Sequence, residues 1–361
     1  MLSLVVRLKA VYKLPVDYDE ENYLFAAQHY AESIRQRDIN MLIGYEFNYE
    51  HPPLAKIVYG LSILALPAFE AITGSHIDDL IASSMPAGQF YAMRLVSAAL
   101  GTWQVLAMAI IDPLAAFFLA INTWQIKYTS QIMLEPLPAL TSLLTVMFYR
   151  RSQSRWNRWL FFSAMALGIT LASKYPYGIV GLAILLDMLV GNSLISTKEI
   201  KGTISRSLFP IIGWGALSIL FFLLFNPRMW SDPLLRFLET VTYHVEYSQN
   251  DRVSQIGFPS WQPFVWLFSS VPWHPDAFLI GIDALVALLA MVGYKRLWGE
   301  SRVFALWLVL AIGFLLIWPT KWPQYILILT APLSLSASVG FRTFVYIPIK
   351  DQWYQWRVAS R

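Results

Sequence analysis

The chain contains no cysteine and has few charged residues. Of its 361 residues, 14% are charged and 57% are hydrophobic, and the mean hydropathy is +0.49. The lack of cysteine excludes a disulfide framework, a thiolate metal site and a cysteine nucleophile. Because a soluble domain usually carries about a quarter charged residues, this chain has too few to cover a globule of its size. We therefore expect the bilayer as its solvent and an all-α, polytopic transmembrane helix bundle as its fold.

The sequence motifs of soluble nucleotide and hydrolase chemistry are also missing. There is no dinucleotide-binding glycine fingerprint, no phosphate-binding loop, no HExxH motif and no serine–histidine–aspartate pattern. The net charge is only +4, and no basic run interleaved with aromatic residues predicts nucleic acid as a partner. Aromatic residues are abundant instead, at 15 Trp, 18 Tyr and 22 Phe, and such residues favour the headgroup region of a membrane.

Apolar runs predict the membrane-spanning segments. They lie at 90–111, 114–128, 135–149, 159–173, 176–190, 207–225, 277–294, 303–318 and 324–345. Several are shorter than the roughly 20 residues that a span needs, which fits broken helices that line a cavity. We expect one transmembrane domain over 1–345, with outer loops at 15–53 and 226–276, and a cytoplasmic tail at 346–361.

The segment before these spans is predicted to lie at the membrane surface. Residues 19–36 have the spacing of an amphipathic interfacial helix, and the Pro52-Pro53 pair favours a helix start at Leu54. The stretch 1–14 carries three basic residues among apolar ones. It is either an interfacial helix or the end of a spanning helix whose first half is missing, and we favour the second.

The distribution of basic residues sets the predicted orientation. Four basic segments alternate with acidic or polar ones, and the positive-inside rule makes them cytoplasmic: they are 150–158, 198–206, 295–302 and 342–361. The chain is therefore predicted to be a multi-pass protein of the cell membrane. The turn at Asp112-Pro113 is the exception, because it should be cytoplasmic and yet has no Lys or Arg.

Five segments on the predicted outer face hold polar side chains that can converge. They contribute Asp19 and Glu20, His51 and Lys56, Glu135, Lys174, and finally Lys321, Gln324 and Tyr325. A carboxylate can take a proton from an acceptor hydroxyl, and cations can hold a phosphate leaving group. A substrate with a phosphate at the headgroup level and a lipid tail in the bilayer fits such a site.

Each of these residues also has a structural interpretation. Asp19 can be an acid in the first turn of a helix, and Glu135, which precedes a proline, can be the same. His51 can be a turn residue, and Lys56 can extend to the headgroups. Lys321 lies between two tryptophans and can anchor the chain at the interface.

Several motifs resemble one family in order along the chain. The acidic pair Asp19-Glu20 followed by His51-Pro-Pro-Leu-Ala-Lys56 resembles the first outer loop of the protein O-mannosyltransferases, glycosyltransferase family 39. It is equally similar to that of their prokaryotic relatives, which include the lipid A aminoarabinose transferases. The segments 128–135, 171–175 and 321–325 are similar to later motifs of the same family.

The resemblance implies an inverting C-type glycosyltransferase. Such an enzyme moves a sugar, often mannose, from a dolichyl- or polyprenyl-phosphate donor to a hydroxyl of a protein or a lipid. It implies that Asp19 is the catalytic base and that Glu20 supports it. The residues expected to bind the substrate, with the basic ones as candidates for the leaving phosphate, are His51, Lys56, Glu135, Lys174, Lys321, Gln324 and Tyr325.

Two alternatives and one cofactor question stay open at this point. Where the family has an arginine, this chain has Ser130 and Gln131, so a catalytically inactive relative is one alternative. A transporter or lipid flippase is the other, although such proteins place charges within their spans and contain internal repeats. No cofactor is certain, and the carboxylates of Asp19, Glu20 and Glu135 leave a divalent cation possible.

Overall fold

The computed structural model describes residues 1–73, 80–81, 85–191, 200–271, 278 and 280–346. In this part of the chain the secondary structure is helical apart from one antiparallel pair of two-residue strands, β1 (Leu80–Ile81) and β2 (Met85–Pro86). The bundle consists of α5 (Ala87–Ile111), α6 (Pro113–Ile121), α7 (Thr123–Tyr128), α8 (Pro136–Ser152), α9 (Arg158–Ser173), α10 (Ile179–Gly191), α11 (Ile200–Leu224), α15 (Asp283–Glu300), α16 (Arg302–Ile317) and α17 (Leu327–Phe341).

The remaining helices precede the bundle or occupy its largest loop. Before it come α1 (Leu2–Lys13), α2 (Tyr18–Gln36), α3 (Ile39–Ile43) and α4 (Leu54–Thr73). The loop after α11 holds η2 (Pro227–Trp230), α12 (Pro233–Ser248), α13 (Asp251–Ile256) and α14 (Gln262–Leu267). Short helices η1 (Tyr175–Gly178), η3 (Pro323–Ile326) and η4 (Arg342–Tyr346) adjoin α10 and α17.

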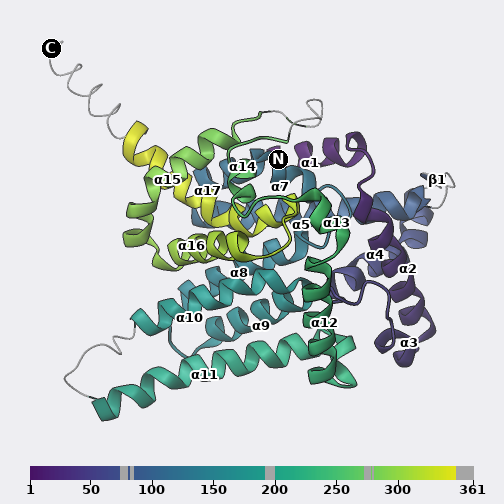
Figure 1. The fold of residues 1–361 in the computed structure, drawn as a ribbon, viewed down its shortest axis with the longest axis horizontal. Coiled ribbons are helices and arrows are strands. Elements are labelled where there is room, and N and C mark those ends of the chain that lie inside the picture. Colours follow the sequence, from purple (N-terminus) through teal and green to yellow (C-terminus); the bar gives the residue numbers. More distant parts are fainter. Residues whose placement is uncertain (74–79, 82–84, 192–199, 272–277, 279, 347–361) are drawn as a thin grey trace.

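The long helices run roughly parallel or antiparallel to one another, and the amphipathic helices cross their ends. Figure 1 shows α8, α9, α10 and α11 lying across the view, with α15, α16 and α17 above them. The most extensive helix contacts join α15 to α17, α8 to α9, and α9 to α11. In contrast, α2 and α12 stand upright at the right-hand ends of the long helices (Figure 1). The predicted combination of a helix bundle with amphipathic helices at one end is therefore present.

The predicted spans correspond to helices, but one of them is broken. The run 114–128 forms two helices, α6 and α7, that meet at Asn122. The Asn122 side chain accepts from Gln125 N (2.8 Å), which caps α7, and donates to Asp283 Oδ1 (2.6 Å) on α15. An uninterrupted helix could not offer both contacts, so this polar network explains the break. The run 277–294 also differs, because α15 begins only at Asp283.

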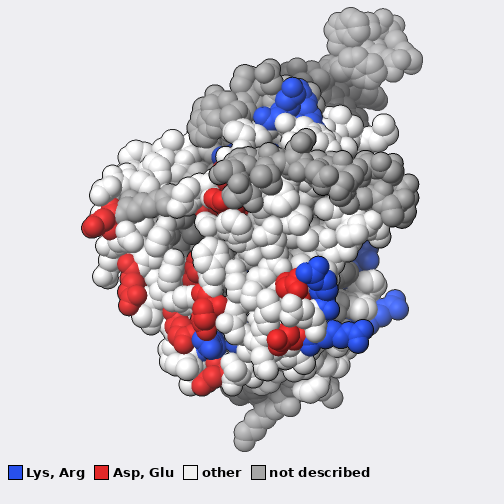
Figure 2. Space-filling model, turned by 90° about the vertical axis from the view of Figure 1, so that its right-hand side faces the viewer, with Lys and Arg blue, Asp and Glu red and all other residues white. Residues whose placement is uncertain are grey.

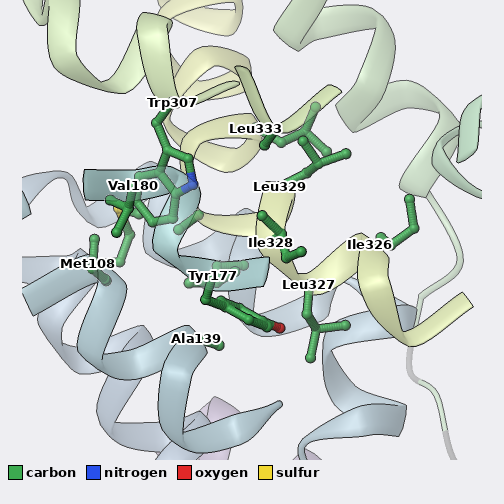
Figure 3. Packing of buried hydrophobic residues seen from close by; sticks show 14 of the residues in the cluster. Met108, Ala139, Tyr177, Val180, Trp307, Ile326, Leu327, Ile328, Leu329 and Leu333 are labelled. Carbon is green, nitrogen blue, oxygen red and sulfur yellow. The ribbon is translucent and has the colours of Figure 1, made fainter. Parts of the chain in front are cut away.

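Glycines allow the closest helix contact in the bundle. A Cβ added at Gly293 of α15 would collide with the backbone of Ser336 and Gly340 on α17, and one added at Gly340 would collide with Leu289. Small residues let two helix backbones approach, which is how apolar helices associate when lipid rather than water surrounds them. The buried hydrophobic core extends well beyond this contact, and Figure 3 shows Trp307 of α16, Tyr177 of η1 and Leu327 of α17 among its residues.

The turn at Asp112 obtains its basic partner from a distant part of the chain. Asp112 caps α6 by accepting from Leu114 N and Ala115 N (2.9 Å each), and it forms an ion pair with Arg342. Arg342 belongs to the basic segment that the sequence analysis placed in the cytoplasm. The turn has no basic residue of its own, but the fold places Arg342 next to it. This ion pair lies at the end of the bundle opposite α2 and α12.

The lengths of the apolar helices agree with the short runs in the sequence. Among the described residues, two helices are long and apolar enough to cross a membrane, Ala87–Ile111 and Pro323–Phe344. Five further apolar helices have 10–17 residues: Leu54–Ala68, Arg158–Ser173, Tyr175–Val190, Leu208–Leu224 and Arg302–Ile317. Most of the tail predicted at 346–361 lies outside the described residues.

Candidate active site

A polar cavity of about 420 Å³ opens where the N-terminus of α2, the loop before α4, the turn after α9, α12 and η3 meet. Five of the predicted site residues line it: Asp19, His51, Lys174, Gln324 and Tyr325. They come from four separate segments of the chain, so the fold alone brings them together. Figure 2 looks onto this end of the molecule, where acidic side chains gather on one side of the view.

Asp19 takes its place from the way in which α2 begins. Asp17 is the N-cap of α2 and forms a capping box with Glu20, whose Oε2 accepts from Asp17 N (2.7 Å). The helix therefore starts at Tyr18, and Asp19 projects from its first turn with its side chain partly exposed. The side-chain amide of Gln324, in the short helix η3, donates to Asp19 Oδ2 at 3.4 Å. A carboxylate at this position faces the cavity directly.

Glu20 lies behind the cavity and not in its lining. It is fully buried and accepts two hydrogen bonds from Arg94 of α5, from Nε to Oε1 (2.7 Å) and from Nη2 to Oε2 (2.6 Å). Glu20 Oε1 also accepts from Ile132 N (2.8 Å). The remaining donors of Arg94 go to backbone carbonyls at the end of α1, including those of Val11 and Leu14. This buried pair fixes the start of α2, and with it the adjacent Asp19.

Lys174 is held at the cavity wall by Glu135. Both side chains are buried and form an ion pair, and the Lys174 ammonium also lies 5.3 Å from the ring centre of Tyr325. Burial opposes the charge of Lys174, but Glu135, Tyr325 and Asp19 outweigh it and raise the pKa of Lys174 above its ordinary value. Glu135 precedes Pro136 at the start of α8, as the structural interpretation predicted. In addition to this place at the helix start, Glu135 holds the Lys174 ammonium at the cavity through their ion pair.

Two histidines stand side by side in the same wall. The rings of His51 and of His244 from α12 are 6.0 Å apart. Burial lowers the pKa of His51 well below its ordinary value, and the charges of Lys174 and Lys56 lower it further. Burial and Lys174 also lower the pKa of His244. Both imidazoles are therefore neutral at pH 7 and can donate or accept hydrogen bonds without adding charge to the site.

Lys56 and Lys321 do not line this cavity. The Lys56 ammonium donates to the carbonyls of Asn48 (2.6 Å) and His51 (2.9 Å), so it holds the loop before α4 in shape. The Lys321 ammonium donates to the carbonyls of Leu315 (2.8 Å) and Trp318 at the end of α16. A cation near the last carbonyls of a helix is stabilised by the helix dipole. Both lysines therefore lie beside the cavity, where their ammonium groups bind backbone carbonyls.

Several residues that line the cavity are not among those predicted from the sequence. Asp17 and Lys127 form an ion pair (3.3 Å) at the cavity edge, and Tyr243 and His244 reach it from α12. Lys127 lies within an apolar run, where a charge is costly and so indicates a partner or a site. The two residues of α12 carry no comparable signal, because only the folding of the loop after α11 brings them to the cavity.

The carboxylates considered for a divalent cation are separated in the structure. Glu20 pairs with Arg94 and Glu135 with Lys174, whereas Asp19 lies in the cavity lining. Among the described residues there is no group of three or more His, Asp or Glu side chains that could hold a metal ion.

Comparisons with known proteins show what this fold is similar to. No family model and no curated protein matches the chain. Two solved structures of ArnT from Cupriavidus metallidurans are similar to this chain in structure. The one bound to undecaprenyl phosphate has a TM-score of 0.58 and 17% identity, and the match covers 94% of this chain and 58% of ArnT. The apo structure has a TM-score of 0.57 and 16% identity, and covers 97% of this chain and 60% of ArnT.

The comparison concerns the fold. This chain spans about 60% of the length of ArnT, and the identity is low. ArnT is a glycosyltransferase of the C-type fold, so the resemblance noted in the sequence is confirmed at the level of architecture. The chain is a polytopic helix bundle with the fold of a C-type glycosyltransferase.

Proposed function

We propose that the protein is an inverting glycosyltransferase that uses a sugar linked to a polyprenyl phosphate at the membrane surface. The observation that carries the proposal is the presence of the Asp19 carboxylate and the Lys174 ammonium in one cavity. A base and a phosphate-binding cation are the two groups that such a transfer requires. The fold shared with ArnT, which has been solved with undecaprenyl phosphate, supports a lipid-linked donor.

The proposed reaction is a single displacement at the anomeric carbon of the donor. The Asp19 carboxylate takes the proton of the acceptor hydroxyl, whose oxygen then forms the new bond to the anomeric carbon. The bond from that carbon to the phosphate oxygen breaks, and the lipid phosphate leaves with the electron pair. Lys174 stabilises the charge that grows on the phosphate. Inversion follows because the hydroxyl attacks opposite to the leaving group, as in inverting hydrolases.

The neighbouring residues have supporting roles in this proposal. Glu135 keeps Lys174 protonated, and the neutral His51 and the Gln324 amide supply hydrogen bonds to the substrate. Glu20 positions Asp19 through Arg94 and acts without touching the substrate. We further propose mannose as the sugar, a hydroxyl of a protein or a lipid as the acceptor, and the cell membrane as the location.

The test is transfer from a radiolabelled polyprenyl-phosphate mannose by the purified protein. We expect the Asp19→Asn variant to lose transfer by about 10²–10⁴-fold, which is the usual contribution of a general base. The thermal midpoint should stay the same, because Asn is of equal size and Asp17, rather than Asp19, caps α2. Unchanged turnover in Asp19→Asn would exclude this residue as the base. No transfer by the wild-type protein with any sugar would favour an inactive relative or a flippase.

A further inference from the structure

Helix α12 has two faces of opposite character. One face is apolar and exposed: Leu234, Leu238, Val241 and Val245 are each 44–70% accessible, and Phe237 beside them is 47% accessible. These residues recur at intervals of three and four, so they form one stripe along the helix. Tyr243 and Tyr247 lie on the opposite face, and His244 lies at its edge, one heptad after Phe237; all three line the cavity. A helix of this kind separates a polar space from an apolar one.

The polar side of α12 is fixed to the rest of the protein. Arg236 forms ion pairs with Glu46 (2.9 Å) and Glu239 (3.0 Å), and Arg228 of η2 binds the same two carboxylates (3.0 and 2.7 Å). The ring of Tyr243 lies 5.5 Å from that of Tyr49. These ion pairs hold the polar side of α12 against the protein, so the apolar stripe faces outward.

The stripe continues the apolar surface of α11. That helix exposes Ile212, Ile219, Leu220 and Leu224 by 55–65%, and η2 connects its end to α12. Trp230, at the junction, is 48% accessible and donates its indole N–H to Leu223 O (2.8 Å). Tryptophan with one apolar and one hydrogen-bonded side is typical of the membrane interface. The exposed apolar residues of α11 and those of α12 are thus joined along the chain through an interfacial tryptophan.

The direction of α12 distinguishes it from the bundle helices. It runs across the ends of α8, α9 and α11 and not alongside them (Figure 1). Its 16 residues reach about 24 Å, which is less than the roughly 30 Å of a hydrocarbon core. A short helix that crosses the ends of spanning helices and has one apolar face is typical of an interfacial helix.

We propose that α12 lies in the lipid interface with this stripe in the acyl region, so that it is the wall between the cavity and the membrane. The occupant of the stripe is lipid and not another protein, because the stripe bears no charge and follows the exposed apolar residues of α11 and the interfacial Trp230. The proposal needs a membrane location only and does not depend on the chemistry at Asp19. If the proposed function also holds, the lipid chain of a donor leaves the cavity past α12.

The chain offers a clean experiment because it contains no cysteine. Single cysteines are introduced as Leu238→Cys and Val245→Cys in the stripe, and as Glu246→Cys, an exposed neighbour outside the stripe. Each variant is labelled with a fluorophore and reconstituted in phosphatidylcholine nanodiscs. Quenching is measured with nitroxide lipids and, separately, with a water-soluble quencher. Thermal melts of the labelled variants against the parent show that each is folded.

The proposal expects the labels at 238 and 245 to be quenched by nitroxide lipids and protected from the aqueous quencher, at a depth of about 5–10 Å below the headgroups. The label at 246 should show the reverse. Equal aqueous quenching at all three positions would overturn the proposal. Protection at 238 and 245 from both quenchers would also overturn it, because a second copy or another protein would then cover the stripe. Neither readout uses turnover, so a failed transfer assay does not affect this test.

Discussion

The two ends of the bundle treat their charged residues differently. At the end opposite the cavity, Asp112 pairs with Arg342, Asp187 with Arg302 (2.6 Å), and Arg296 with Glu300 (2.6 Å). The first two pairs join separate elements, and the third lies within α15. At the cavity end, Asp19, Lys174 and the two histidines are directed at an open volume. The cavity end also has pairs that join separate elements, such as Glu20 with Arg94, but it differs in that an acid, a cation and two histidines line the larger cavity.

After the loss of the base, the largest expected effect comes from removing the cavity cation. Lys174→Met should lower kcat/KM by about 10²–10³-fold, as does the loss of one group that stabilises transition-state charge. It also leaves Glu135 buried without its partner, which costs about 3–5 kcal/mol of stability. The double variant Lys174→Met/Glu135→Gln removes both charges and should recover most of the stability but none of the activity. Recovery of activity in the double variant would show that Lys174 has only a structural role.

The next effect tests whether Glu20 acts through position. Arg94→Leu leaves Glu20 buried and unpaired, so we expect a loss of about 3–5 kcal/mol in unfolding free energy together with a lower kcat. In the matched variant Glu20→Gln, the amide keeps some of the hydrogen bonds, and a smaller loss of both is expected. A pH–rate profile of Glu20→Gln with the wild-type shape would agree with a positioning role. Loss of one ionisation from that profile would mean that Glu20 is itself the base.

A smaller effect is expected at the opposite end. Asp112→Ala removes the cap of α6 and the partner of Arg342, which should cost about 1–2 kcal/mol. Its kcat/KM should remain that of the wild type at temperatures where the variant is folded. Thermal melts and transfer assays on the same sample check both statements. If Asp112→Ala lost turnover but kept its stability, the end of the bundle at Asp112 would also contribute to activity, which contradicts the comparison above.

The last expected effect is a pH dependence of stability and leaves activity at neutral pH aside. His51 has an ordinary pKa of 6.5 that burial lowers well below that value in the folded protein. Below pH 6.5 the unfolded chain binds a proton at this position that the folded chain does not, so stability falls as the pH decreases. One such group contributes at most about 1.4 kcal/mol per pH unit. His51→Gln should flatten the profile of thermal midpoint between pH 6.5 and 5, and an unchanged slope would contradict the neutral state of His51.

The sequence predicted the helices better than the details of the site. Apolar runs and the proline before α4 located most helices because lipid requires nearly continuous apolar segments. The break at Asn122 was missed, because it depends on Asp283, which lies 161 residues away. The order of the motifs correctly indicated that Asp19, His51 and Lys174 lie at one cavity. It also predicted Lys56 and Lys321 there, and these two do not line it. Those two lysines bind backbone carbonyls, and no sequence pattern distinguishes such a contact from a substrate contact.

The central claim is that the Lys174 side of the cavity binds the phosphate of a polyprenyl lipid. The most direct measurement is the ³¹P resonance of undecaprenyl phosphate in nanodiscs, titrated with wild-type protein, Asp19→Asn, and the Lys174→Met/Glu135→Gln pair variant. We predict a saturable shift with the wild type and with Asp19→Asn, and none with the pair variant. An equal, saturable shift with the pair variant would contradict the claim.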